Sequence, residues 1–203
     1  MTMRYIIIFL VLLCPVLASA QEKYIYLNLD VLKPTSNTGW IEDVTMAAGK
    51  IGYRGFVRPN FSAGLTLGWA NYDQYKPPFT KENATGAVTT DYFNYIYSYT
   101  GVVSGQYYFK DEDEDRFFPY AGLGLGAATN EYVLYYNIYE DAERSWGFLA
   151  RPEIGLLFRF TERGSVGIMA AIHYDYATNK SEKFNYNNFS ALGFQIGIMA
   201  MTF

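Results

Sequence analysis

The sequence has little cysteine, histidine or excess positive charge, and each shortage excludes a class of protein. A single cysteine can form neither an intrachain disulfide nor a multi-cysteine metal site. A single histidine rules out a histidine-cluster metal centre. The formal net charge of −4 argues against a nucleic-acid partner, because proteins that bind the phosphate backbone normally carry a basic excess. We therefore expect no metal, no cofactor and no nucleic acid.

Long apolar runs are also missing beyond the N-terminus, although 50% of the 203 residues are hydrophobic. The chain contains 20 tyrosines and 15 phenylalanines, so aromatic side chains supply much of that half. A membrane-spanning helix would need about 20 consecutive apolar residues. The length is sufficient for one domain with a sizeable core. The hydrophobic residues must therefore be distributed in a pattern other than long runs.

The first twenty residues have the pattern of an export signal. Arg4 supplies the positive n-region, residues 6–17 are mostly apolar, and Ala18-Ser19-Ala20 has the form of a signal-peptidase site. We predict cleavage between Ala20 and Gln21, which would leave a mature chain without cysteine. The absence of cysteine is compatible with an oxidising compartment outside the cytoplasm.

Beyond residue 20, apolar residues alternate with polar or small ones, which is the pattern of β-strands with two different faces. Within 61–70, for example, Leu65 and Leu67 share one parity, whereas Thr66 and Gly68 share the other. Helical periodicity persists nowhere for more than a turn or two. The predicted strands are 23–32, 44–57, 61–70, 91–109, 118–128, 148–160, 165–176 and 189–203.

The predicted connections alternate in length. The short ones are 58–60, 110–116 and 161–164. The long, polar ones are 33–43, 73–90, 129–146 and 177–188. Short turns on one side and long loops on the other are typical of outer-membrane barrels. An even number of strands would place both ends of the barrel chain on the short-turn side.

The parity of the charged residues distinguishes a membrane barrel from a soluble one. They share a face with the small and polar residues, and the opposite face is apolar. An apolar outer face of this extent exceeds what a soluble monomer exposes, whereas membrane barrels have an apolar exterior and a polar lumen. We therefore predict an all-β, transmembrane, eight-stranded antiparallel up-and-down barrel. The charged residues assigned to its lumen are Lys50, Arg54, Arg151, Glu153 and Arg159.

These five lumen residues need partners, because a buried charge is costly when unpaired. We expect them to contact each other or Asp30. Eight strands leave an interior just wide enough for side chains. The network would then fill the lumen, and a gated small pore is the alternative.

Aromatic residues gather near the ends of the predicted strands, as in the two interfacial girdles of a membrane barrel. Beside the short turns lie Phe56, Phe61, Phe109, Phe117, Phe118 and Phe160. Near the long loops lie Trp69, Trp146, Tyr72, Tyr92, Tyr95, Tyr97, Tyr174 and Tyr176.

The signal sequence, the eight alternating segments and the terminal Phe203 resemble the OmpA/OmpX-type small outer-membrane β-barrel superfamily over essentially the whole mature chain. The resemblance implies an outer-membrane location, contact with lipid and lipopolysaccharide, and one barrel domain over 21–203 after the signal peptide at 1–20. It also implies that Phe203 is the signal read by the barrel-assembly machinery. We expect a monomer with no further domain after the last strand.

The parity of the last strand conflicts with this role of Phe203. If Phe203 faces lipid, then Met199, Met201 and Gln195 face lipid too. In that case Phe194, Ile196 and Ile198 point into the lumen. We therefore expect either a bulge in this strand or an apolar inner face.

Two segments could carry chemistry. Residues 172–176 are similar to the His-x-Ser-Asn region of lipid A 3-O-deacylases, but Asp175 stands at the serine position, so the nucleophile is missing. His173 falls on the lumen parity, where a bond to a neighbouring polar residue is the simpler interpretation. The acidic run 111–115 lacks the ligand spacing of a calcium loop and is interpreted as a solvated turn.

We therefore expect a non-enzymatic outer-membrane protein with an envelope-structural or surface-interaction role. The alternatives are a small-solute or ion pore, a lipid A-modifying barrel and a component of a secretion system.

Overall fold

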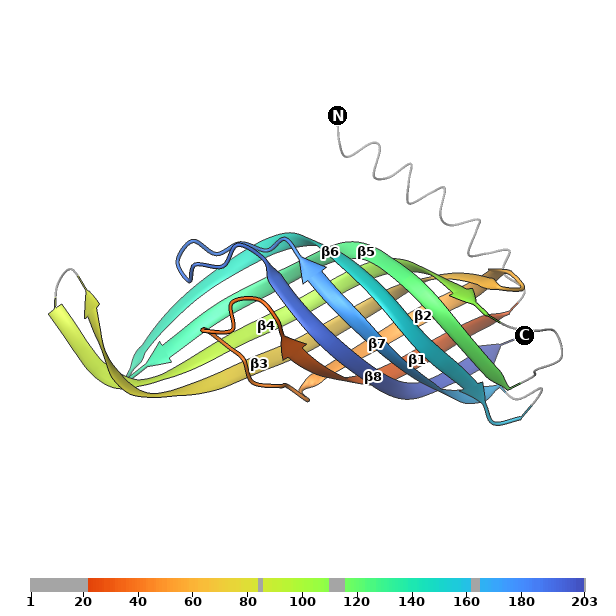
Figure 1. Ribbon diagram of the computed structural model, residues 1–203, viewed down its shortest axis with the longest axis horizontal. Coiled ribbons are helices and arrows are strands. Elements are labelled where there is room, and N and C mark those ends of the chain that lie inside the picture. The colour runs from red at the N-terminus through yellow and green to blue at the C-terminus, as the bar shows by residue number, and fades with distance from the viewer. Residues whose placement is uncertain (1–21, 84–85, 110–115, 162–164, 203) are drawn as a thin grey trace, which may run out of the picture.

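The chain folds into a closed antiparallel barrel of eight strands, as a computed structural model shows (Figure 1). Each strand pairs with its neighbours in sequence, and β8 closes the ring against β1. The structure describes residues 22–83, 86–109, 116–161 and 165–202. The strands are β1 (Lys23–Pro34), β2 (Ala48–Arg58), β3 (Phe61–Asn83), β4 (Gly86–Tyr108), β5 (Phe117–Tyr136), β6 (Tyr139–Arg159), β7 (Val166–Ala177) and β8 (Phe189–Thr202).

The predicted fold class and strand order are confirmed. Several predicted features lie outside the described residues: the signal peptide with Ala18, Ala20 and Gln21, the acidic run 111–115, and Phe203. The described part of the chain contains no helix that is long and apolar enough to cross a membrane, which leaves a crossing by strands untested.

The prediction of long loops at 73–90 and 129–146 is wrong, because strands continue through most of both segments. β3 and β4 stay paired well beyond residue 73, and β5 and β6 meet at a two-residue turn at Asn137 and Ile138. Asn137 has φ of 53°, a left-handed conformation that asparagine adopts more readily than most residues. These segments are polar because they leave the lipid, while their many tyrosines and threonines still favour strand structure.

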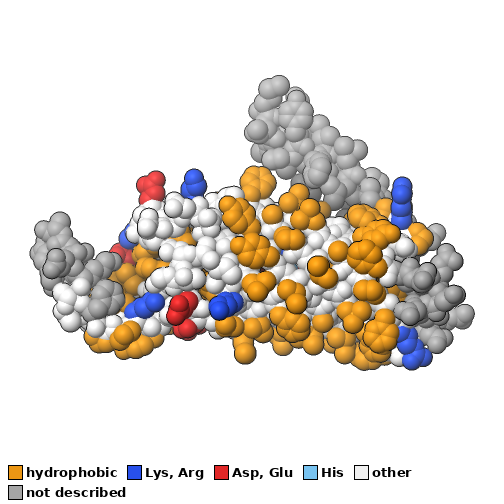
Figure 2. Space-filling view, in the orientation of Figure 1, with side chains coloured by type: hydrophobic (Ala, Val, Ile, Leu, Met, Phe, Trp, Pro, Cys, Tyr) orange, Lys and Arg blue, Asp and Glu red, His pale blue; other side chains and the backbone are white. Residues whose placement is uncertain are grey.

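The outer face of the barrel is apolar, and the middle of the inner face is polar or charged. Leu29 and Ile154 are 70% and 72% exposed, whereas Arg54 is 1% exposed. Figure 2 shows hydrophobic side chains gathered over one part of the barrel, with charged side chains beyond both ends of this belt. Because this arrangement is the inverse of a soluble protein, the exposed belt suits contact with lipid.

The expected bulge is absent from the described residues of the last strand, and the assignment of Phe194, Ile196 and Ile198 to the lumen is wrong, because the apolar residues on its inner face are Met199 and Met201. Ile196 and Ile198 are exposed, whereas Gln195, Met199 and Met201 are buried. β8 pairs continuously with both β1 and β7 over these residues, without a register shift. The ordinary alternation therefore holds, because the isoleucines and not the methionines face outward.

The predicted aromatic belts are only partly correct. Phe61, Phe109, Phe117 and Phe160 are exposed at the short-turn end, and Trp69, Trp146, Tyr174 and Tyr176 are exposed near the other end. Phe118, Tyr72 and Tyr92 are buried. Proximity to a strand end gives the level of an aromatic residue, but the parity of its position decides whether it faces lipid or the interior.

Two apolar clusters occupy the ends of the barrel interior. At the short-turn end, Tyr24, Tyr108 and Tyr120 pack with Met199 and Met201. At the other end, the connections after β1 and after β7 bring Ile41, Phe184 and Tyr186 against β3 to β5. The polar centre of the barrel lies between these two clusters.

The lipid-facing assignment predicts a contrast between two isoleucine-to-arginine substitutions. Ile154→Arg places a cation within the apolar belt, between Trp146 and Phe160, and we expect it to lower the free energy of unfolding in bilayers by about 2–4 kcal/mol. Ile138→Arg, at the turn between β5 and β6, is the matched control and should change stability little. Urea titration in lipid vesicles with heat-modifiable gel migration measures both, and equal effects would contradict the assignment.

Candidate functional site in the barrel lumen

The centre of the lumen holds a histidine between two carboxylates and a lysine. Nδ1 of His173 lies 3.1 Å from Asp175, and Nε2 lies 3.0 Å from Asp30. Lys50 Nζ is 2.6 Å from the Asp30 carboxylate and 2.6 Å from Nε2 of His173. His173 is 2% exposed, so this group is closed off from solvent. The alternation of β1, β2 and β7 turns all four side chains inward.

Arg151 on β6 extends this group through a two-point ion pair. Its Nε and Nη2 donate to the two carboxylate oxygens of Asp175 on β7, each at 2.6 Å. Two parallel charge-assisted hydrogen bonds fix both side chains in one orientation. Asp175 also contacts His173, so it joins the arginine to the histidine.

Arg54 and Glu153 form the part of the lumen nearer the short turns. Arg54 Nη2 lies 3.6 Å from Glu153 Oε1 and also donates to Ser104. The amide of Gln106 donates to the same glutamate at 2.5 Å, and Gln195 links Glu153 to Lys50. Neutral amides therefore connect the ion pairs, which satisfies charges that would otherwise be costly to bury.

The ionisable side chains of this group form what we call the central network. Its members are Asp30, Lys50, Arg54, Arg151, Glu153, His173 and Asp175. The three carboxylates balance the three lysine and arginine cations, so the network has no net charge when His173 is neutral.

The structure brings four of the five predicted lumen residues into this network but not Arg159. Lys50, Arg54, Arg151 and Glu153 lie in it, whereas Arg159 is buried near the short-turn end with its guanidinium carbon 4.4 Å from the centre of the Phe118 ring. A cation over an aromatic face is attracted by the ring quadrupole, so Arg159 has a different kind of partner from the one expected.

The sequence interpretation overlooked Asp175 and Gln106 as members of the lumen. The signal for Asp175 was available, because it is two residues from His173 and therefore shares its face of the strand. Gln106 had the same kind of signal within β4. The partner of Arg151 was not deducible, since Asp175 comes from the next strand and their contact depends on the register.

Glycines on the lumen face make room for this network. A Cβ atom at Gly193 would collide with the imidazole of His173, and one at Gly122 would press on Gln106 and Glu153. Small residues opposite large polar ones are expected in a narrow, filled barrel.

Two small cavities border the network. One of about 10 Å³ is lined by Lys50, Arg151 and Glu153 among others, and one of about 20 Å³ lies beside Asp30 and Asp175. Each is about the size needed for a single water molecule.

A second layer of side chains lies over the mouth of the barrel at the end where the hairpins β3–β4 and β5–β6 extend, which we call the long-hairpin end. Trp40 and Phe184 pack with ring centres 4.6 Å apart, and Tyr132 stacks on Tyr186 at 4.7 Å. Asn94 donates to the carbonyl of Trp40 at 2.7 Å, which ties this layer to β4. We call Trp40, Ile41, Phe184 and Tyr186 the cap.

The closed ring, the apolar outer belt and the polar centre of the interior are the architecture of small outer-membrane β-barrels. The predicted resemblance to OmpA/OmpX-type barrels and the outer-membrane class are thus confirmed at the level of the fold. No family model matches the sequence, and neither does any curated protein sequence.

Three solved outer-membrane barrels are similar to the chain. Neisserial surface protein A matches with a TM-score of 0.55 and 16% identity, over 88% of this chain and 96% of the other. OprG of Pseudomonas aeruginosa matches with a TM-score of 0.51 and 12% identity, over 90% and 96%. Ail of Yersinia pestis, an attachment invasion locus protein, matches with a TM-score of 0.50 and 11% identity, over 89% and 97%. These identities support the shared fold alone.

The Arg151–Asp175 pair predicts strong coupling between the two residues. Arg151→Met or Asp175→Leu alone leaves a buried charge without its partner and should lower the free energy of unfolding by about 3–5 kcal/mol. The double variant should lose much less than the sum of the two single variants. Urea unfolding of all four proteins in the same detergent measures the coupling, and additive losses would show that the pair does not act as a unit.

The packing of Tyr132 against the cap predicts a loss of stability at alkaline pH. Tyr132 lies in β5 beyond the apolar belt, and burial raises the pKa of its phenol from the usual 10 to about 12. Because the folded protein favours the neutral phenol, the contribution of Tyr132 to stability is complete below pH 10 and is lost as pH rises towards 12. Phenolate absorbance should show that Tyr132 ionises near pH 12 in the folded protein, and unfolding measurements should show a loss of stability between pH 10 and 12. Tyr132→Phe should remove this part of the pH dependence. Ionisation of Tyr132 near pH 10 in the folded protein would refute it.

Proposed function

We propose that the protein is a non-enzymatic outer-membrane barrel with a closed lumen, which supports the envelope or interacts with partners at the cell surface. The observation that carries the proposal is the presence of two layers of packed side chains inside the barrel. The central network lies in the middle of the interior, and the cap lies at the end where β3 to β6 extend. If these layers close the lumen, a solute would have to displace both of them.

The expected orientation assigns the two ends of the barrel to different compartments. In outer-membrane barrels, short turns face the periplasm and long extensions face outward. On this basis β3 to β6 extend from the cell surface, where they are available to partners. We propose that lipid and lipopolysaccharide surround the apolar belt, that the barrel-assembly machinery inserts the chain with Phe203 as its signal, and that the barrel is a monomer.

The proposal that the protein lacks catalytic activity rests on His173 and its partners. The position that would hold a serine nucleophile is Asp175, and both of its carboxylate oxygens accept hydrogen bonds from Arg151. His173 itself lies inside the barrel, whereas the acyl chains of lipid A would lie against the outer face. This arrangement favours a structural role for the histidine over lipid A modification.

Planar-bilayer recording tests the closed lumen directly. We expect the wild-type protein to give no defined unitary current. Because the two closures lie in series, neither Lys50→Ala with Arg151→Ala nor Phe184→Ala with Tyr186→Ala should conduct alone. The four substitutions together should produce unitary currents.

Two outcomes would contradict the proposal. A defined unitary current from the wild-type protein would support the small-pore alternative instead. Conductance in the cap variant alone would show that the central network does not close the lumen. Heat-modifiable migration confirms that each variant is folded, and mass analysis of lipid A with and without the protein tests the enzymatic alternative.

A further inference from the structure

Beyond the apolar belt, β3 to β6 continue as a four-stranded sheet that projects past the rest of the barrel (Figure 1). Trp69 on β3, Tyr99 on β4 and Trp146 on β6 are the last large exposed residues of the belt on these strands. The outward positions that follow on β3 and β6 are Asn71 and Arg144, so the belt ends between the tryptophans and these residues. The outer face of the projecting sheet thus lies outside the lipid.

The strand register arranges this outer face in three rows. The first row is Asn71, Tyr97, Glu131 and Arg144. The second row is Asp73, Tyr95, Val133 and Ala142. The third row is Tyr75, Phe93, Tyr135 and Glu140. Aromatic residues run down the middle of the sheet, and carboxylates flank them in every row.

The aromatic side chains pack against each other and are therefore ordered. Tyr75 and Phe93 have ring centres 5.1 Å apart, and Tyr95 lies 5.7 Å from Tyr135. Val133 in the middle of the face is only 3% exposed. We call Tyr75, Phe93, Tyr95, Tyr97 and Tyr135 the tyrosine face. Because its rings are already fixed, a partner would not have to order them on binding.

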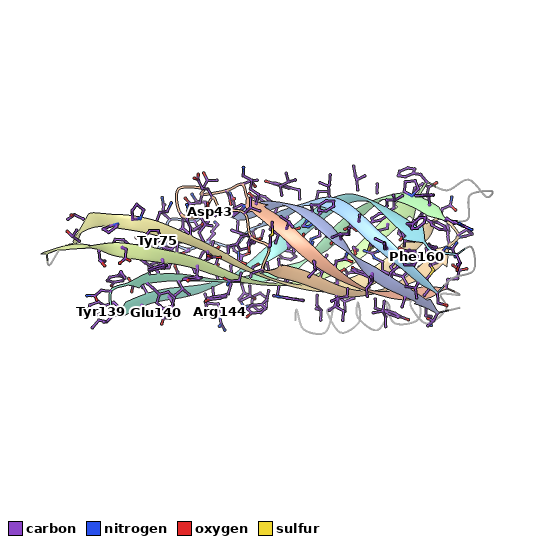
Figure 3. The ribbon with its side chains drawn as sticks, turned by 90° about the horizontal axis from the view of Figure 1, so that it is seen from below. Asp43, Tyr75, Tyr139, Glu140, Arg144 and Phe160 are labelled. Carbon is purple, nitrogen blue, oxygen red and sulfur yellow. The ribbon has the colours of Figure 1, made fainter. Side chains whose placement is uncertain are left out.

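The charges around the tyrosine face are mainly negative. Glu131 and Arg144 form an ion pair at 3.0 Å and offset each other. Asp73 and Glu140 form no ion pair with any described residue and retain their charges on the surface. Figure 3 places Tyr75, Glu140 and Arg144 on this projecting part, with Phe160 at the opposite end of the barrel. Aromatic faces with unpaired carboxylates beside them attract cations by both ring quadrupole and charge.

We propose that the tyrosine face, flanked by Asp73 and Glu140, docks a lysine- or arginine-rich extended polypeptide. The proposal deepens the surface-interaction role and therefore rests on the proposed function. An open face without an enclosing cage suits an extended chain better than a single small amine. Successive rows are two strand residues apart, about 6.6 Å, and same-side residues of an extended peptide have this same spacing. Phosphate-bearing partners are disfavoured, because their charge has the same sign as Asp73 and Glu140.

The experiment uses the full-length barrel in nanodiscs of zwitterionic phospholipid, so that the lipid itself does not retain a cationic probe. The probe is a short fluorescent peptide of alternating lysine and serine, and binding is followed by anisotropy. We expect saturable binding that weakens as salt is added, because the charges are exposed. A peptide with glutamate in place of lysine should not bind.

Variants then separate the aromatic from the electrostatic contribution. Tyr95→Ala should weaken binding about twofold to fivefold, as expected for an exposed cation–π contact, whereas Tyr95→Phe keeps the ring and should bind nearly as well as wild type. Asp73→Asn with Glu140→Gln should weaken binding about threefold to tenfold. Asp43→Asn removes a negative charge from the β1–β2 connection at the same end of the barrel and is the matched control (Figure 3).

Several outcomes would overturn the proposal. These are no binding of the lysine peptide by the wild-type protein, a loss from Asp43→Asn as large as that from Asp73→Asn with Glu140→Gln, or an unchanged affinity in Tyr95→Ala. Binding of a neutral oligosaccharide in place of the cationic peptide would assign the face to glycans instead. Because the tyrosine face lies outside the lumen, these results are independent of the conductance measurement that tests the closed barrel.

Discussion

In the hydrocarbon of a membrane, water cannot satisfy backbone N–H and C=O groups, so a β-sheet must close on itself. The pairing of β8 with β1 meets this constraint here, and the remaining features follow from it. Closure with eight strands leaves a narrow interior, which side chains have to fill. The alternation along each strand then forces every second residue into that interior and the others into lipid.

A narrow interior of this kind can hold charges only if they are paired. The central network meets that requirement with equal numbers of carboxylates and cations, and with Gln106 and Gln195 as neutral links. The two apolar ends of the interior exclude water from the network, which strengthens its ion pairs and raises the penalty for leaving one incomplete. The same packing that stabilises the barrel therefore also underlies the proposal of a closed lumen.

The projecting sheet follows different rules, because only part of the barrel reaches beyond the lipid. Its inner face is covered by the cap through Ile41, Phe184 and Tyr186, while its outer face keeps aromatic side chains exposed to water. In the belt such residues would contact lipid, but here carboxylates stand beside them. The chemistry of one continuous outer surface thus changes, within two residues along β3 and β6, from an apolar belt to aromatic rings with carboxylates beside them.

Period-two alternation was sufficient to determine the fold class, the strand order and the inward position of residues such as Lys50, Arg54 and His173. It was sufficient because the parity of a strand position is a local property of the sequence. The alternation in β8 was also readable, but the assumption that Phe203 faces lipid reversed its interpretation. The continuation of β3 to β6 was overlooked because polarity was interpreted as loop, although polarity reports the surroundings of a strand and not its backbone.

Contacts between strands were decided only by the tertiary structure. The pairing of Arg151 with Asp175, the separate place of Arg159 on Phe118 and the rows of the tyrosine face all depend on register and side-chain reach. Register is set by how complete strands pair around the closed ring, so no local stretch of sequence encodes it. Alternation in the sequence alone determined the inward side of residues such as Lys50, Arg54 and His173, and ring closure decided which residues meet there.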